Sequence, residues 1–323
     1  MKIGRAVLGG PRHLAMAALG PLETRLLQAS DAKDCRVVFV VGPPRSGTTL
    51  LFELLVTRYQ FSYFSNLAHR LYQTPAAATF LGRPLIHRWR GEFRSEFGHI
   101  PGWGSPCEAG WIWQRWLRNR PGISVADVPI ESQRTMQRTI ASIAHSLHAP
   151  FLSKNVEHSI HIQVLSSIFP TCCFIQIIRD RTDVVQSILR ARKKLNDPRQ
   201  RPDWWSVKPR DWESYEGEDP TLQACAQVVL TQRSIDADVA AIGENRQHII
   251  SYESLCRNTH EVLDRVARFL DSRGTRITQR GPVPRSFVRS GPIDDPSPGR
   301  ARIKEVLDRL DSDDANAVQE HGF

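Results

Sequence analysis

Residues 42–49 read GPPRSGTT, and the two glycines in this stretch have the spacing of a phosphate-binding loop. An apolar run at 36–41 precedes the stretch and a helical pattern follows it. A strand, a glycine-rich turn and a helix aim backbone N–H groups and the positive helix end at one point, so this order predicts an anion site. Thr48 stands where a nucleoside triphosphatase has its lysine, and the basic residue is Arg45. Because Arg45 offers a fixed cation with two donors, the loop favours two bridged anionic centres, such as a phosphosulfate.

A second pair of residues has a spacing that suits another phosphate. Arg179 follows the apolar run 172–178, and Ser187 lies eight residues later in the helical stretch 182–192. Ligands of parallel sheets bind at the carboxyl ends of the strands, where Arg179 is expected. The alternative is that Arg179 forms an ion pair with Asp183 and that Ser187 is a surface hydroxyl. Beside the loop at 42–49, the phosphate-binding interpretation is favoured.

The two motifs together resemble those of P-loop sulfotransferases, in particular the bacterial and protein-tyrosine-like branch. This resemblance covers 36–58 and 151–272 and is vague over 59–150. It implies 3′-phosphoadenosine 5′-phosphosulfate (PAPS) as co-substrate, with the 3′-phosphate on Arg179 and Ser187. Most members have a proline where this chain has Arg181. The residues that the resemblance assigns to the phosphosulfate are Pro44, Arg45, Ser46, Gly47, Thr48 and Thr49.

Three residues are predicted to carry the chemistry, namely Arg45, Lys154 and Glu108. The stretch FLSKN at 151–155 is similar to the family's K-x-P stretch, which makes Lys154 the counterpart of its active-site lysine, although Val156 replaces the proline. Family members take a general base from the region after the first helix. We favour Glu108, because the following WIWQRW is expected to raise its pKa. The alternative is a structural Glu108 in a helix beginning near Ala109.

Other bases remain open at this point, and no metal is expected. The further candidates for the general base are Glu96, His99 and His69.

Short apolar runs alternate with helical patterns, which predicts an α/β fold in which helices flank a parallel sheet. The expected strands are 36–41, 151–154, 172–178 and 248–252. The helix over 182–192 has Thr182 as its expected N-cap, and another helix is expected over 260–274. A small-residue helix that caps the domain is expected at 14–20, where the apolar run is closed by Pro21 and Glu23.

We expect a single domain over 1–323, divided into four functional parts. The loop unit is 36–58, and 59–150 is a helical insertion that forms the acceptor region. The 3′-phosphate motif lies in 151–272, and 281–300 is a candidate cofactor-covering loop. In that loop Arg285 and Arg289 could approach the 3′-phosphate; a solvated basic loop is the alternative. All eight Trp lie in 71–120 and 193–220, where they form satellite cores or an acceptor pocket.

Composition bounds the class of partner. The net charge of +9 suits an anionic ligand, but the Lys and Arg residues are scattered, so no nucleic-acid partner is expected. Six cysteines without a C-x-x-C pair indicate reduced thiols and a cytoplasmic protein. No apolar run reaches the length of a membrane span. The expected acceptor is a small molecule or glycan: a carbohydrate, a lipid-linked sugar or another hydroxyl or amine compound. The alternatives are a P-loop kinase or NTPase, and a non-catalytic protein that binds anions or nucleic acid.

Overall fold

A four-stranded parallel sheet forms the centre of the computed structural model, which describes residues 10–31, 35–95, 98–117, 121–194, 204, 206–290 and 298–320. The strand order is β2-β1-β3-β4. The strands are β1 (Val37–Val41), β2 (Phe151–Lys154), β3 (Cys173–Ile178) and β4 (Gln247–Ser251). All four predicted strands are present, with ends shifted by at most one residue.

The burial of each strand follows its place in the sheet. β1 pairs with β2 on one side and β3 on the other, and all five of its residues are buried. Such a strand needs apolar side chains on both faces, which the sequence VVFVV provides. β4 lies at an edge, and its Ile249 is 52% exposed. Because all strands are parallel, their carboxyl ends bring residues 42–47, 155, 179 and 252 to one edge of the sheet.

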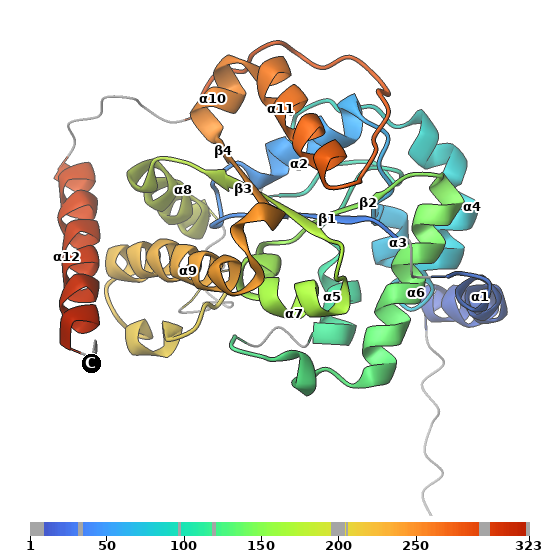
Figure 1. Ribbon diagram of the computed structural model, residues 1–323, viewed down its shortest axis with the longest axis horizontal. Coiled ribbons are helices and arrows are strands. Elements are labelled where there is room, and N and C mark those ends of the chain that lie inside the picture. The colour runs from blue at the N-terminus through green and yellow to red at the C-terminus, as the bar shows by residue number, and fades with distance from the viewer. Residues whose placement is uncertain are drawn as a thin grey trace, which may run out of the picture.

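Helices cover both faces of this sheet, which confirms the α/β class (Figure 1). One face carries α2 (Thr48–Arg58), α10 (Tyr252–Arg257) and α11 (Thr259–Ser272), while α7 (Ile162–Ile168) and α9 (Pro220–Ile242) lie on the other. The predicted helix at 260–274 is thus α11. Short 3-10 turns complete the connections: η1 (Val125–Asp127), η2 (Val156–Ile160), η3 (Trp212–Tyr215) and η4 (Glu244–Arg246).

The region 59–150 is built from α3 (Asn66–Arg70), α4 (Pro75–Arg88), α5 (Gly110–Leu117) and α6 (Ile130–Leu147). The N-terminal helix α1 (Pro11–Gln28) packs against α4 and α6. The expected helix at 14–20 is part of α1, which continues through Pro21. Its second half is held by tertiary contacts: the buried Glu23 carboxylate accepts hydrogen bonds from the backbone N–H groups of Ala76 and Ala77 at the start of α4.

The helix after β3 is α8 (Arg181–Lys194), and its cap differs from the prediction. Asp180 accepts a hydrogen bond from the backbone N–H of Asp183 at 2.9 Å, so Asp180 is the N-cap and Thr182 lies within the first turn. Both residue types cap helices well, but the helix begins one residue earlier than the apolar pattern indicated.

A second hydrophobic cluster joins α8 and α9 to the C-terminal helix α12 (Pro298–Glu320). Trp204 and Trp212 belong to this cluster, whereas Trp113 and Trp116 are buried in the main core. These four tryptophans therefore form cores, as one of the two sequence interpretations has it. No described helix has both the length and the apolar character that a membrane span needs.

Residues 277–290, here called the closing segment, run from the end of α2 back to the edge of the sheet that carries the loop. The backbone N–H of Arg280 donates to Arg58 O at 2.8 Å, and the Arg280 guanidinium donates to the carbonyls of Val56, Ile86 and Trp89. Farther along, the N–H of Phe287 donates to Cys256 O at 2.8 Å. These contacts fix the course of a segment that has no helix or strand of its own.

Candidate functional site

The loop after β1 is held open by close backbone approaches that only glycine permits. Gly47 has a φ of 105°, and a Cβ there would lie 2.5 Å from Cδ2 of Tyr252. Two hydrogen bonds with Ser159 hold the backbone of Gly42, because Ser159 Oγ accepts from its N–H at 3.0 Å and donates to its carbonyl at 3.1 Å. Arg45, between the glycines, has a φ of 68°, an uncommon value for a residue with a side chain. The loop is therefore a rigid cradle in front of α2.

The polar groups inside this cradle are ready for an anion. Ser46 is 1% exposed, and its Oγ has no hydrogen-bond partner among the described residues. Thr48, the first residue of α2, is 4% exposed. A buried hydroxyl without a partner is costly, and the helix N-terminus beside it attracts negative charge. A phosphate at this point would satisfy both.

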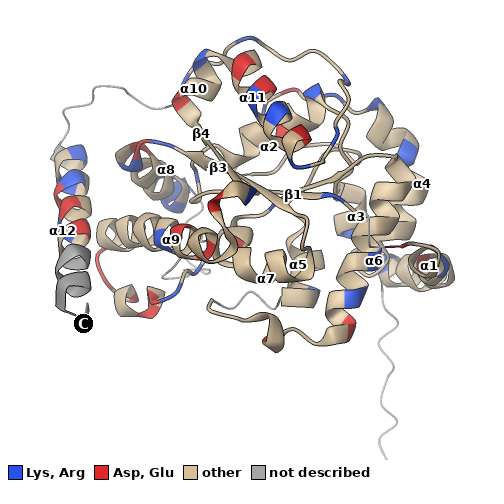
Figure 2. Ribbon diagram, in the orientation of Figure 1, with Lys and Arg blue, Asp and Glu red and all other residues tan. Residues whose placement is uncertain are grey.

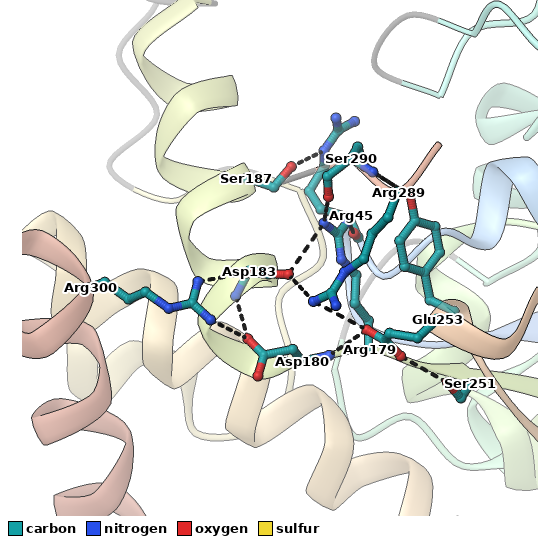
Figure 3. A network of polar contacts seen from close by, with 11 residues as sticks. Arg45, Arg179, Asp180, Asp183, Ser187, Ser251, Glu253, Arg289, Ser290 and Arg300 are labelled. Carbon is teal, nitrogen blue, oxygen red and sulfur yellow. Dashed lines mark hydrogen bonds and ion pairs between the residues drawn. The ribbon is translucent and has the colours of Figure 1, made fainter. Parts of the chain in front are cut away.

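Arg45, Arg179 and Ser187, which the sequence assigned to the co-substrate, come together at the mouth of the loop (Figure 3). Arg45 Nε donates to Ser187 Oγ at 3.1 Å, and Arg179 Nη1 donates to the carbonyl of Arg45 at 3.2 Å. Burial, and then the charges of Arg179 and Arg190, lower the pKa of Arg45. Cations that destabilise one another in this way would be stabilised by an anion bound beside them.

The ion pair between Arg179 and Asp183, which was the alternative interpretation of the sequence, is also present, but its distance is long. Arg179 Nη2 lies 3.9 Å from Asp183 Oδ2, whereas Arg289 of the closing segment reaches the same oxygen at 2.6 Å. Arg179 also donates to the carbonyl of Ser290, and its guanidinium lies 4.4 Å over the Tyr252 ring. Arg289 therefore approaches the Arg179 motif as the sequence suggested. Arg285 is exposed, and its carbonyl accepts from the N–H of Thr259.

A second polar group forms beside the loop, where β2 ends. Lys154 is 2% exposed, and its Nζ donates to Thr49 Oγ1 at 3.0 Å and to a carboxylate oxygen of Glu108. Asn155 Nδ2 donates to the Glu108 carbonyl at 3.1 Å, which fixes the backbone at this point. The structure thus brings Lys154 and Glu108 together at the second threonine of the loop.

The surroundings of Glu108 differ from what the sequence indicated. Helix α5 begins at Gly110, so Glu108 precedes its first turn, whereas the structural alternative placed it in that turn. The predicted apolar surroundings are replaced by the Lys154 cation, because Trp113 and Trp116 turn into the core against Phe64. Glu108 also faces a close backbone approach, since a Cβ at Gly98 would lie 2.6 Å from Glu108 Oε1.

The other candidate bases lie elsewhere or cannot be placed. Glu96 falls outside the described residues. His99 is exposed and follows the Gly98 that approaches Glu108. His69 stacks on Trp111 with 4.5 Å between ring centroids, and burial, followed by the charges of Arg12 and His99, lowers its pKa. Among the described candidates, Glu108 is thus the one whose side chain contacts Lys154.

Sequence reasoning missed a second acid at this place, Glu157 in η2. Its backbone N–H donates to Asn155 Oδ1 at 3.0 Å, the same side chain that donates to the Glu108 carbonyl. Burial, and then the charge of Glu108, raise the pKa of Glu157 to about 7. An acid three residues after the lysine at a strand end was the signal available in the sequence.

Replacing Glu157 by Gln should stabilise the protein at pH 8 and leave stability unchanged at pH 4.5. The pKa of the carboxyl rises from 4.5 to about 7 on folding, so its contribution to stability falls as the pH rises through this window. Gln removes that loss, and the gain at pH 8 should be roughly 1–3 kcal/mol. Urea denaturation at the two pH values measures it. A difference between variant and wild type that does not change with pH would contradict the assignment.

Among the described residues, no group of three or more His, Cys, Asp or Glu side chains is arranged to hold a metal ion. What the site offers is a cradle of N–H groups, two partly or fully buried arginines, a buried lysine and a carboxylate beside it. This arrangement suits the binding of a doubly anionic ligand and a proton transfer next to it.

Comparison with solved structures shows bacterial sulfotransferases with this fold. The sulfotransferase STF9 from Mycobacterium avium matches with a TM-score of 0.54 and 17% sequence identity, over 92% of this chain and 73% of that one. The sulfotransferase STF1 from Mycobacterium tuberculosis matches with a TM-score of 0.51 and 13% identity, over 91% and 76% of the two chains. At such identities the likeness concerns the fold. No curated protein matches the chain.

The sequence itself matches a family model described as the Sulfotransferase family, over residues 37–273. The match begins at β1, includes the loop, β2, the Arg179–Ser187 motif and β4, and ends after α11. Since it spans well over half of the 323 residues, the chain belongs to the sulfotransferase family.

Proposed function

We propose that this protein transfers a sulfuryl group from PAPS to a hydroxyl or amine of a small-molecule or glycan acceptor. The observation that carries the proposal is the convergence of Arg45, Arg179 and Ser187 at the mouth of a phosphate cradle. PAPS has a 5′-phosphosulfate and a separate 3′-phosphate, and the site offers a cationic group for each.

The residues present fit these two anions. For the 5′-phosphosulfate, the buried Ser46 hydroxyl still lacks a partner within the described chain, and the loop N–H groups and Thr48 surround it. For the 3′-phosphate, Arg179 Nε is likewise buried without a partner there, and Ser187 adds a hydroxyl. Charge-assisted hydrogen bonds to these groups would give both affinity and orientation.

The transfer step needs a cation for the leaving oxygen and an acceptor for a proton. The bond between sulfur and the bridging oxygen breaks, and the electron pair stays on the 5′-phosphate. Lys154 and Arg45 would stabilise the charge that develops there. A new bond forms between sulfur and the acceptor oxygen or nitrogen, whose proton passes to Glu108. Lys154 already touches both Thr49 and Glu108, so the two requirements meet at one place.

The acceptor would bind from the side of residues 59–150. Glu108 belongs to this region, and its side chain is 32% exposed whereas Lys154 is buried. An acceptor can therefore reach the carboxylate from solvent. Carbohydrates, lipid-linked sugars and other small hydroxyl compounds present the group that this chemistry requires.

Two other functions are less well supported. A kinase or NTPase would use a lysine where Thr48 stands, and Thr48 is buried at the start of α2. A nucleic-acid-binding protein would gather its basic residues on one face. Figure 2 instead shows acidic and basic residues interleaved along α11 and α12.

The direct test is a comparison of two nucleotides. The protein should bind the desulfated product, 3′-phosphoadenosine 5′-phosphate (PAP), roughly 10²-fold more tightly than adenosine 5′-monophosphate (AMP), because hydrogen bonds to a charged group contribute about 1.5–3 kcal/mol each. Isothermal titration calorimetry measures both affinities, and EDTA should leave the preference intact. Equal affinities would remove the 3′-phosphate assignment and the PAPS proposal with it.

A further inference from the structure

Asp183 is a buried acid at the centre of the 3′-phosphate motif. It lies in the first turn of α8, midway between Arg179 and Ser187 in the sequence, and none of its side chain is exposed. Figure 3 shows three arginines directed at it. Arg289 and Arg300 each reach one of its oxygens at 2.6 Å, while Arg179 remains at 3.9 Å.

The close contacts of Arg289 and Arg300 have a consequence for Arg179. A buried carboxylate without close partners would draw Arg179 to itself, and an anionic ligand would then have to compete with it. Burial raises the pKa of Asp183, but the hydrogen bonds from Arg300 and Arg289 outweigh this and lower it. The charge of Asp183 is therefore compensated by the two other arginines, and Arg179 keeps its buried Nε without a partner among the described residues.

The balance of charge around Arg179 depends on Arg300. Asp180, Asp183 and Glu253 face Arg45, Arg179, Arg289 and Arg300 in this network. Among these described residues, removal of Arg300 would take one positive charge from a group that also contains three carboxylates. A site for a phosphate needs the excess of positive charge.

Arg300 comes from a part of the chain that the family match does not include. It lies in the first turn of α12, beyond residue 273, where the match ends. Apolar residues of α12, namely Ile303, Val306, Leu307 and Leu310, pack in the second cluster with α8 and α9. A second ion pair joins α8 and α12, because the guanidinium of Arg181 in α8 donates to both carboxylate oxygens of Asp311 in α12, at 2.9 and 2.6 Å.

We propose that α12 is part of the nucleotide site, with Arg300 as a positioning residue that neutralises Asp183 and so leaves Arg179 available to the nucleotide's 3′-phosphate. The inference rests on the proposed function, because it takes the 3′-phosphate of PAPS as the anion. It assigns to the C-terminal helix a role in specificity and not only in packing.

The test is Arg300→Ala in the full-length protein, with PAP and AMP titrated by calorimetry. The affinity for PAP should fall about tenfold, because one positive charge beside Asp183 is lost and Asp183 draws Arg179 away. The affinity for AMP should stay within twofold of the wild type, since AMP has no 3′-phosphate. Arg300→Lys, which keeps the charge, should retain most of the affinity for PAP.

Two matched variants separate the charge of Arg300 from the docking of α12. Asp311→Asn weakens the second ion pair between α8 and α12 without touching Asp183, and PAP binding should stay within twofold of wild type. Adding Asp183→Asn to Arg300→Ala removes the competing carboxylate and should restore much of the lost affinity for PAP. A helix that only supports the fold would not give this recovery.

The outcomes are distinguishable from those of the proposed function. If wild type prefers PAP over AMP but Arg300→Ala binds PAP equally well, the role of Arg300 is refuted and the proposed function stands. Equal losses in Arg300→Ala and Asp311→Asn would reduce α12 to a scaffold and also overturn the inference. A wild-type protein that does not distinguish the two nucleotides would refute the proposed function itself.

Discussion

Glu108→Gln should lower the rate of sulfuryl transfer by roughly 10²–10³-fold at neutral pH, with PAP binding unchanged. Gln keeps the size of the side chain and can still accept a hydrogen bond from Lys154, so the contact at the end of β2 survives. It cannot take the acceptor's proton. The measurement is the initial rate of label transfer from radiolabelled PAPS, beside calorimetry with PAP.

Matched variants of the other candidate bases give a second readout. His99→Asn and Glu96→Gln are the comparison variants. If either loses transfer with normal PAP binding while Glu108→Gln stays active, that residue is the base. A Glu108→Gln protein that loses thermal stability or PAP affinity would instead support a structural role.

Arg45→Ala should lower transfer by roughly 10²-fold or more, because a fixed cation in a partly buried site is lost. The fold should survive, since the Arg45 side chain lies at the polar mouth of the loop. Alanine keeps a Cβ, so the substitution removes the cation and leaves the positive φ of 68° at this position as it is. Single-turnover rates at saturating PAPS measure the effect.

The division of the Arg45 effect between rate and affinity identifies the phosphate that it serves. A loss confined to the rate constant indicates the charge that develops on the leaving 5′-phosphate, and a loss of affinity for PAP that AMP does not share indicates the 3′-phosphate beside Ser187. Arg190→Ala is the control: it removes an exposed cation whose charge acts on Arg45, and its effect should be no more than a few-fold. Full transfer activity in Arg45→Ala would contradict its assignment.

The fold could be predicted from the sequence because short apolar strands that alternate with helices indicate a parallel sheet. VVFVV and CFIQII have few polar residues, so each can only be buried, and the helices after them repeat at helical spacing. The two nucleotide motifs could also be read locally. The spacing of Gly42 and Gly47 indicates a phosphate-binding turn, and the spacing of Arg179 and Ser187 indicates a strand end followed by the second turn of a helix.

What could not be predicted depends on contacts between distant parts of the chain. Glu108 meets Lys154 across 46 residues, and the irregular stretch before α5 has no period that would fix its position. Glu157 gains its raised pKa from burial and from Glu108, neither of which a sequence displays. Arg300 is one basic residue among many until α12 packs on α8 and brings it to Asp183.

The closing segment has a consequence for how the protein is made. Its Ser290 accepts a hydrogen bond from Arg179, which lies 111 residues earlier in the chain. Arg45 donates a hydrogen bond to Ser187, which is synthesised 142 residues after it. A ribosome adds about 5–20 residues per second, so the loop leaves the exit tunnel many seconds before the residues that complete its surroundings. During that interval a nascent chain can pair β1 with β3, yet it exposes unopposed arginines to cellular polyanions. The proposed nucleotide site is therefore complete only after residues 277–300 have been synthesised, and a product that lacks residues 277–323 should not distinguish PAP from AMP.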